Sequence, residues 1–144
     1  MHDESFVEID ELGSIFWRNK EGKLHRLDGP AVEYSDGTKE WYCNGVLHRL
    51  DGPAHEDIYG TKQWYKNGRS HRLDGPAIEW ETGSKEWWKE GRLHRLDGPA
   101  LIFISGAKFW YKDGNKFKNK DTFFRSLNKK EKELALFSED FLNS

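Results

Sequence analysis

The heptapeptide His-Arg-Leu-Asp-Gly-Pro-Ala at residues 25–31 decides the fold, because it returns unchanged at residues 48–54, 71–77 and 94–100. Each copy begins 23 residues after the one before it. A fixed period of this kind indicates a repeat protein, in which each unit buries its apolar surface against its neighbours. The structure of one unit therefore defines the fold of the array.

The same period runs through residues outside the heptapeptide. All 14 glycines fall into three columns and all four prolines into one. A lysine column begins at Lys39, and an incomplete earlier unit is visible at Gly13, Trp17 and Gly22. The array therefore begins near Ser5. The tryptophan column consists of Trp41, Trp64, Trp87 and Trp110.

Each unit has the sequence pattern of short strands joined by turns. Two extended runs, 31–35 and 39–43, flank the turn signal Asp36-Gly37, and Asn44-Gly45 is a second turn of the type that needs positive φ. A lone hairpin is only marginally stable in water, so the units must stack. We expect a mainly β fold: an elongated antiparallel sheet of stacked 23-residue β-hairpins, each burying its tryptophan against the next.

The repeat pattern stops after Gly114, and helix-forming residues follow. Asn119 or Asp121 can cap a first helix, and Asn128 with Glu131 resembles a capping box that opens a second. Ser138 can start a last helical turn. We therefore predict a repeat array over residues 1–117 and a helical cap over residues 118–144, packed on the last repeat.

The fourth unit indicates where this cap packs. Phe109 stands in the column that holds Glu40 in the first unit, and Ile102 stands in the column of Glu33. We expect the helices to cover Phe103, Phe109 and Ile102, which would close an edge otherwise open to strands of other molecules.

Length and composition exclude several classes of protein. The chain of 144 residues has the size of one domain, and its formal charge of -2, with both signs interleaved, gives no basic field for nucleic acid. Cys43 is the only cysteine, so an internal disulfide and a four-thiolate zinc site are excluded. Without a long apolar stretch or a signal-like beginning, we expect a soluble cytoplasmic protein that binds neither membrane nor nucleic acid.

The segment from Trp41 through Asn44-Gly45 to His48, with its later copies, resembles MORN-type repeats. The chain departs from them at Arg49, where ordinary MORN units have a glycine directly after the histidine. It is similar in this to a variant branch found in uncharacterised phage, bacterial and giant-virus proteins. Over residues 5–114 the resemblance implies stacked hairpins that act mainly as scaffolds for protein contacts and, in some members, in lipid headgroup association.

The histidines and arginines of the heptapeptide are the candidate residues for binding a ligand or partner, because they recur together four times. Neighbouring copies are at least two strands apart, about 10 Å, so four histidines cannot share one metal ion. The simpler interpretation is structural: Asp28 accepts hydrogen bonds from loop amides and pairs with Arg26 or an arginine of the next unit. The candidate binding residues are His25, Arg26, His48, Arg49, His71, Arg72, His94 and Arg95; the structural ones are Asp28, Asp51, Asp74 and Asp97 with the four tryptophans of the column.

Catalysis has little support in the sequence. Every reactive residue type recurs at equal intervals, and outside the columns only His2, Cys43 and His55 stand alone. We predict no enzyme, no cofactor and no metal. The leading hypothesis is a scaffold that binds another protein, such as a phage or bacterial protein that inhibits a host factor. The alternative is a sponge for a small anionic ligand, such as a nucleotide messenger, and self-association through the first edge near residues 6–9 stays open.

Overall fold

The structure is a computed structural model, and it describes residues 5–144, so that residues 1–4, His2 among them, lie outside the described part. The chain forms two compact units, Met1–Ser70 and His71–Ser144. Both are built from antiparallel hairpins, and the second also carries three short helices. The expected mainly β fold of stacked hairpins with a small helical end is confirmed.

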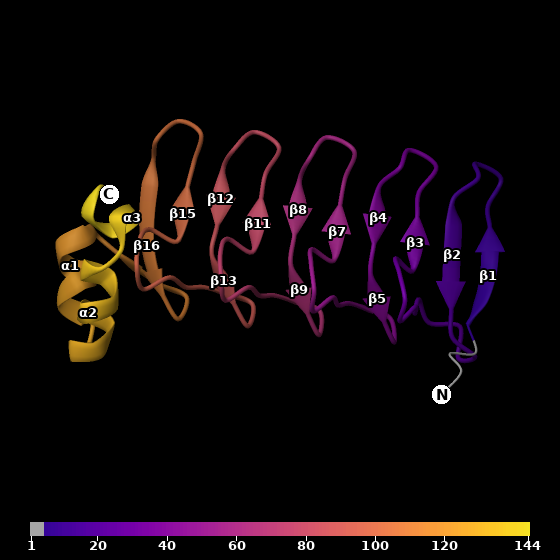
Figure 1. Cartoon of the computed structure of the whole chain (residues 1–144), viewed down its shortest axis with the longest axis horizontal. Coiled ribbons are helices and arrows are strands. Elements are labelled where there is room, and N and C mark those ends of the chain that lie inside the picture. Colours follow the sequence, from indigo (N-terminus) through magenta and orange to yellow (C-terminus); the bar gives the residue numbers. More distant parts are fainter. Residues whose placement is uncertain (1–4) are drawn as a thin grey trace. The chain divides into compact units, whose positions relative to one another are not determined.

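The first unit contains six strands of antiparallel sheet, hydrogen-bonded in the order β1-β2-β3-β4-β7-β8. Two small ladders, β5 with β6 and β9 with β10, continue below them (Figure 1). The bounds are β1 Phe6–Ile9, β2 Ile15–Arg18, β3 Val32–Glu33, β4 Lys39–Glu40, β5 Tyr42–Cys43, β6 Val46–Leu47, β7 His55–Glu56, β8 Lys62–Gln63, β9 Tyr65–Lys66 and β10 Arg69–Ser70.

The second unit repeats this arrangement and ends in the helices. Its strands follow the order β11-β12-β15-β16-β17, with β13 and β14 as a small ladder. The bounds are β11 Ile78–Glu79, β12 Lys85–Glu86, β13 Trp88–Lys89, β14 Arg92–Leu93, β15 Leu101–Ile102, β16 Lys108–Lys112, β17 Asn115–Phe117, α1 Lys120–Ser126, α2 Lys129–Leu136 and α3 Glu139–Leu142.

The expected strand 39–43 is divided into β4 and β5 at Trp41. The Trp41 N–H donates to the carbonyl of Ala54 (2.8 Å), and its own carbonyl accepts from the N–H of His48 (3.0 Å). The two halves of the run therefore pair with different strands, β4 with β3 and β7, and β5 with β6. Trp64 and Trp87 divide their strands in the same way, whereas Trp110 lies within the continuous strand β16.

The core differs from the predicted one. The heptapeptide alanines Ala31, Ala54, Ala77 and Ala100 are fully buried, whereas the tryptophans of the column are only partly buried. The prediction that each tryptophan is buried against the next unit was therefore incomplete. The alanine at the end of each loop is small enough for the loop to lie directly on the sheet, whereas the larger tryptophan ring stays partly exposed.

The turn between β5 and β6, which we call the lower turn together with its copies in the other repeats, adopts the predicted conformation. Asn44 has φ of 50° and Gly45 has φ of 85°, so both central residues of the turn are left-handed. Glu90 and Asp113 hold the same φ of 50° in the second unit, although glutamate is uncommon in this region. An additional interaction, described below, holds these residues there.

The cap helices begin at the predicted polar residues. Asn119, not Asp121, caps α1 in a capping box with Thr122, and Asn128 with Glu131 does the same for α2. Ser138 caps α3. The helices lie beside β16 (Figure 1) and bury Phe123, Leu127, Ala135 and Phe141 among themselves.

The predicted docking face of the cap was wrong. The cap cluster packs against Leu96, Trp110 and Phe117. Trp110 points to the face opposite its strand neighbour Phe109, because side chains alternate along a strand. Phe109 instead contacts Phe103 edge to face, at 5.9 Å between ring centroids. Ile102 pairs with Lys108, which places it on the other face from Phe109.

Candidate functional site: the heptapeptide loops

The arginine of each heptapeptide is held inside its own loop. Arg26 donates from Nε to Asp28 Oδ1 (2.8 Å) and from Nη1 to the carbonyl of Pro30 (3.3 Å). Its guanidinium carbon lies 4.1 Å from the ring centroid of Trp17, which is a cation–π contact. The predicted structural pairing of Asp28 with Arg26 is therefore observed.

The later loops repeat this geometry with little variation. The distances from Nε to aspartate and from Nη1 to the proline carbonyl are 3.0 and 3.1 Å for Arg49, 2.9 and 3.1 Å for Arg72, and 2.8 and 3.2 Å for Arg95. Arg49 lies over Trp41 at 4.0 Å and Arg95 over Trp87 at 3.9 Å. The heptapeptide arginines therefore stack on tryptophan rings in both units.

Gly52 shows why the loop needs its glycine. Its φ is not positive, so backbone strain is not the reason. A Cβ at this position would lie 2.8 Å from Cζ of Arg49, which is too close for any real contact. The glycine therefore leaves the space in which the guanidinium stacks on Trp41.

The histidine of each heptapeptide holds the turn that follows it. Its Nδ1 accepts a hydrogen bond from the backbone N–H of the turn residue with φ of 50°. The pairs are His25 with Asn44 (3.0 Å), His48 with Asn67 (3.0 Å), His71 with Glu90 (3.1 Å) and His94 with Asp113 (3.0 Å). A histidine nitrogen can accept such a bond when the ring is neutral and its proton is on the other nitrogen, Nε2. This is what keeps Glu90 and Asp113 in the left-handed region.

The electrostatics of the loops follow from these contacts. The hydrogen bond from Arg26 holds the pKa of the Asp28 carboxyl below its usual value, and Arg49 does the same for Asp51. A second carboxylate stands near each of these arginines, Glu33 at 3.6 Å and Glu56 at 3.7 Å. Each loop therefore has two acidic groups for one arginine.

The leucine of the heptapeptide is largely exposed to solvent in three of the four loops. Leu27 is 70% exposed, and Leu50 and Leu73 are each 78% exposed. Leu96 differs, because the cap cluster packs against it. We call Leu27, Leu50 and Leu73 the exposed loop leucines.

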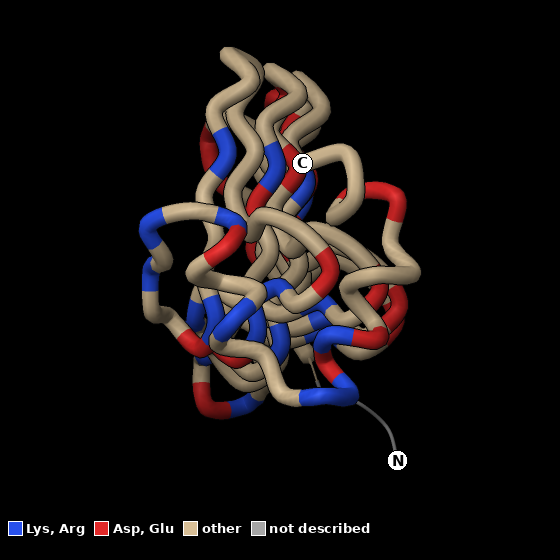
Figure 2. The backbone as a smooth tube through the Cα atoms, turned by 90° about the vertical axis from the view of Figure 1, so that its left-hand side faces the viewer, with Lys and Arg blue, Asp and Glu red and all other residues tan. Residues whose placement is uncertain are grey.

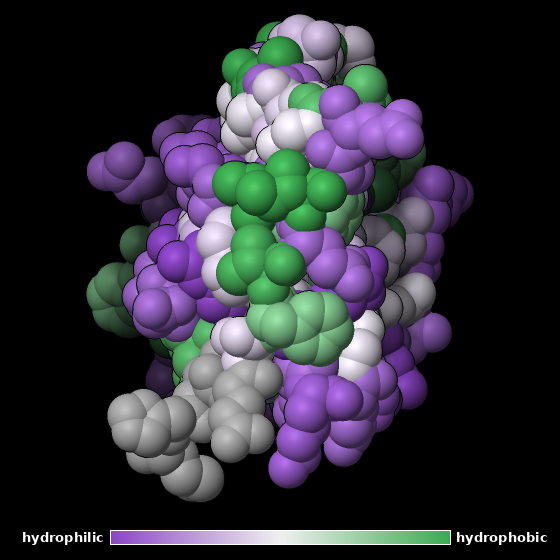
Figure 3. All heavy atoms as spheres, turned by 90° about the vertical axis from the view of Figure 1, so that its right-hand side faces the viewer, coloured by the Kyte–Doolittle hydropathy of each residue, from purple (hydrophilic) through white to green (hydrophobic). Residues whose placement is uncertain are grey.

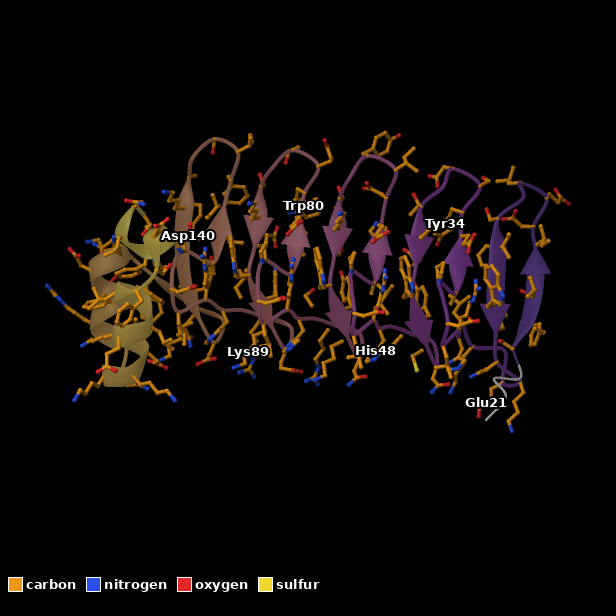
Figure 4. All side chains as sticks on the ribbon, viewed as in Figure 1. Glu21, Tyr34, His48, Trp80, Lys89 and Asp140 are labelled. Carbon is orange, nitrogen blue, oxygen red and sulfur yellow. The ribbon has the colours of Figure 1, made fainter. Side chains whose placement is uncertain are left out.

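The cap engages the fourth loop by polar contacts as well. Arg95 donates from Nη2 to Asp140 Oδ2 (2.5 Å), and the Ser138 hydroxyl donates to the carbonyl of Asp97 (2.8 Å). Asp140 is labelled in Figure 4. Arg95 is consequently almost fully buried, unlike Arg26 and Arg49. In Figure 2, where the C-terminal helices face the viewer, Lys and Arg positions are interspersed with Asp and Glu positions along the backbone.

Shallow pockets separate consecutive loops within each unit. In the first unit a pocket of ≈ 710 Å³ is lined by residues of loops 25–31 and 48–54, with Trp41 and Cys43 between them. In the second unit a pocket of ≈ 630 Å³ lies between loops 71–77 and 94–100. Their walls hold the exposed leucines and the arginine-bound aspartates, so each pocket combines an apolar rim with acidic groups.

The candidate residues do not converge on one centre. Nδ1 of His25 contacts the turn at Asn44, which lies outside its own loop. Within residues 5–144, no three His, Cys, Asp or Glu side chains are grouped so that they could hold a metal ion. Each histidine therefore holds a separate turn, and each arginine holds its own loop.

A carboxylate network on the other face of the sheet was missed in the sequence. Glu40 accepts hydrogen bonds from the hydroxyls of Tyr34 and Tyr42 (3.2 Å each) and lies 3.0 Å from Nδ1 of His55. The hydrogen bond with His55 lowers the pKa of Glu40, and the same bond raises the pKa of His55. Burial, supported by the Glu40 charge, raises the pKa of Tyr42 to about 12.

The equivalent carboxylate of the second unit, Glu86, accepts from the indole N–H groups of Trp80 and Trp88, at 2.8 Å each. Tyr34 and Trp80 are labelled in Figure 4. The period-two alternation that puts residues 40 and 42 on one face was a usable signal for this network. The contacts of Tyr34 with Glu40 and of Trp80 with Glu86 depend instead on how the chain folds back at the turn between them.

Compared with known proteins, the chain matches no protein-family model and no curated protein. Among the described residues, no helix has both the length and the apolar character that crossing a membrane requires.

Proposed function

We propose that this protein is a non-enzymatic repeat scaffold, a MORN-like variant, that binds another protein through its heptapeptide loops. The observation that carries the proposal is the exposure of Leu27, Leu50 and Leu73 in loops whose arginines and histidines make internal contacts. Groups engaged in this way support the loop, and the leucine is the apolar side chain that the loop exposes to solvent.

An exposed leucine brings no folding free energy through burial, since it stays in water. Its recurrence in three loops is explained if another surface covers it. The loops are also rigid, because each arginine has two hydrogen-bond partners in its own loop. A rigid surface loses little conformational entropy on binding, which favours association.

The cap offers an intramolecular example of such a contact. The fourth copy of the same leucine, Leu96, lies against the aromatic and aliphatic side chains of the helices. A helical protein surface therefore fits this loop. In line with the resemblance to phage and bacterial repeat proteins, the partner in this proposal is a host protein in the cytoplasm, which the scaffold inhibits.

The test is affinity capture from the natural host with two matched variants. In the first variant, Leu27, Leu50 and Leu73 are each replaced by Ser. In the second, Ser replaces exposed residues of the turns between β7 and β8 and between β15 and β16, namely Ile58, Tyr59 and Ile104. We expect an identified host protein to be retained by the natural chain and the second variant, and lost from the first. Equal retention by both variants would contradict the proposal.

A small anionic ligand remains the second candidate, on one observation. Arg26 and Arg49 face the first pocket, and within residues 5–144 their Nη2 atoms have no hydrogen-bond partner. The two carboxylates that accompany each arginine oppose anion binding. Native mass spectrometry of the isolated protein and calorimetric titration with cyclic nucleotides test it, and a titration without heat would exclude nucleotides of that class.

A further inference from the structure

The outer strand β1 of the first unit presents apolar side chains to solvent on both of its faces. Phe6 is 45% exposed, Val7 51% and Ile9 68%. Figure 3 shows hydrophobic atoms in a continuous run along this side of the molecule. Successive residues of a strand point to opposite faces, so Phe6 lies on one face and Val7 and Ile9 on the other.

Among residues 5–144, the backbone of β1 is paired along one side only, with β2. The N–H of Asp10 donates to Ser14 (3.0 Å), and β1 and β2 pair Phe6 with Arg18 and Glu8 with Phe16. Because ladder bonds alternate along an antiparallel strand, the N–H and C=O groups of Phe6 and Glu8 face β2 and those of Val7 and Ile9 face outward. The N–H of Trp17 points the other way, to Ala31 (2.8 Å), as this alternation requires.

The strand lacks the features that usually protect a sheet edge. It contains no proline and no lysine, and its one charged residue, Glu8, is paired with Arg18 at 2.7 Å. In the second unit, by contrast, α1 packs beside the last strand, β17. We propose that two copies of this chain pair through β1, antiparallel, across a two-fold axis.

Charge selects the register of this pairing. A two-fold axis at Glu8 would place the two Glu8 carboxylates opposite each other, and an axis at Ile9 would place Glu8 opposite Asp10 of the other copy; like charges in opposite positions are destabilising. An axis at Val7 places Glu8 opposite Phe6 and Ile9 opposite Ser5. This register uses the outward groups of Val7 and Ile9 and keeps the carboxylates apart.

The partner is a second copy because this edge is self-complementary. A two-fold axis places the apolar residues and the outward backbone groups of one copy against the same groups of the other copy. The contact does not involve the heptapeptide loops. Dimerisation and the proposed binding of another protein can therefore fail independently of each other.

The first experiment measures mass as a function of concentration, by sedimentation equilibrium of the full chain. We expect a transition from 16.9 kDa to twice that mass as concentration rises. Val7→Pro removes an outward N–H without touching the β1–β2 ladder, and Ile9→Lys places a charge on the edge; both variants should be monomeric, with unchanged circular dichroism. The control, Leu12→Ser, removes an exposed leucine (79%) outside the strand and should leave the dimer intact. A natural chain that stays monomeric, or a dimer that survives in both variants, would overturn the proposal.

The second experiment tests the register by disulfide formation in a Cys43→Ser background. Directly opposed residues of a hydrogen-bonded antiparallel pair have Cα atoms about 5.5 Å apart, within disulfide range. Val7→Cys should therefore give a covalent dimer on mild oxidation, and Glu8→Cys should not. Faster cross-linking through position 8 than through position 7 would overturn the register.

Discussion

Nδ1 of His48 accepts a hydrogen bond of 3.0 Å from the backbone N–H of Asn67, a residue held at φ of 50°. One heptapeptide thus fixes the lower turn that comes 19 residues later. The four copies of this contact give the histidine that recurs in the heptapeptide a structural role.

The first prediction concerns this bond. We expect His48→Leu to lower the free energy of unfolding by about 1–2 kcal/mol, because the Asn67 N–H loses its acceptor. His48→Asn should retain most of the stability, since its side-chain oxygen can replace Nδ1. Urea denaturation of the three proteins measures the difference, and equal losses in both variants would show that the hydrogen bond is not the cause.

The second prediction is an acid weakening through His94. Burial, which outweighs the Asp113 charge, places its folded pKa below the ordinary 6.5. A group whose folded pKa is lowered stabilises the fold above its unfolded pKa, and this stability is lost as pH falls below 6.5 towards the folded value. We expect the free energy of unfolding to fall over that window, and His94→Asn to flatten the fall. An unchanged pH profile in His94→Asn would contradict this assignment.

His55 should have the opposite effect. Its hydrogen bond with Glu40 raises its folded pKa above 6.5, so its stabilisation is full below 6.5 and is lost as pH rises through the folded value. Glu40, with a lowered pKa, loses its share only as pH falls below 4.5. We expect His55→Val to remove the alkaline loss, measured as the unfolding free energy across neutral pH. Glu40→Gln should give the same flattening, and a variant that keeps the slope would argue against the pair.

The fourth prediction concerns the space above Gly52. An alanine there places its Cβ against the Arg49 guanidinium and displaces it from Trp41, so we expect Gly52→Ala to cost about 1–2 kcal/mol. In an Arg49→Ala background the same change should cost far less. A double-mutant cycle measures this coupling, and additive losses would contradict the proposed steric cause.

The fifth prediction concerns the attachment of the cap. Asp140→Asn removes the charge that faces Arg95, and we expect faster amide exchange in α3 and a loss of about 1 kcal/mol in stability. Glu133→Gln, on the exposed side of α2, is the matched control and should change neither. Identical exchange in both variants would show that the ion pair does not hold the helix.

The local structure could be read from the sequence because its causes are local. The turn at Asn44-Gly45 needs positive φ at two successive residues, and the 23-residue period places the same turn in every unit. The capping residues Asn128 and Glu131 act within one helical turn of each other, so their role was predictable as well. The candidate site was predictable in its residues, but the structure gave them supporting roles.

The sequence by itself determined that hairpins of equal length stack, since a repeated pattern of turn and strand residues admits one local structure. Only the tertiary structure decided that Arg49 stacks on Trp41, that the cap packs on Trp110 and not on Phe109, and that the loop leucines stay exposed. These outcomes depend on which surfaces meet after the chain folds back. Neighbours that are far apart in the sequence are set by the geometry of the whole unit, and not by the residues next to them in the chain.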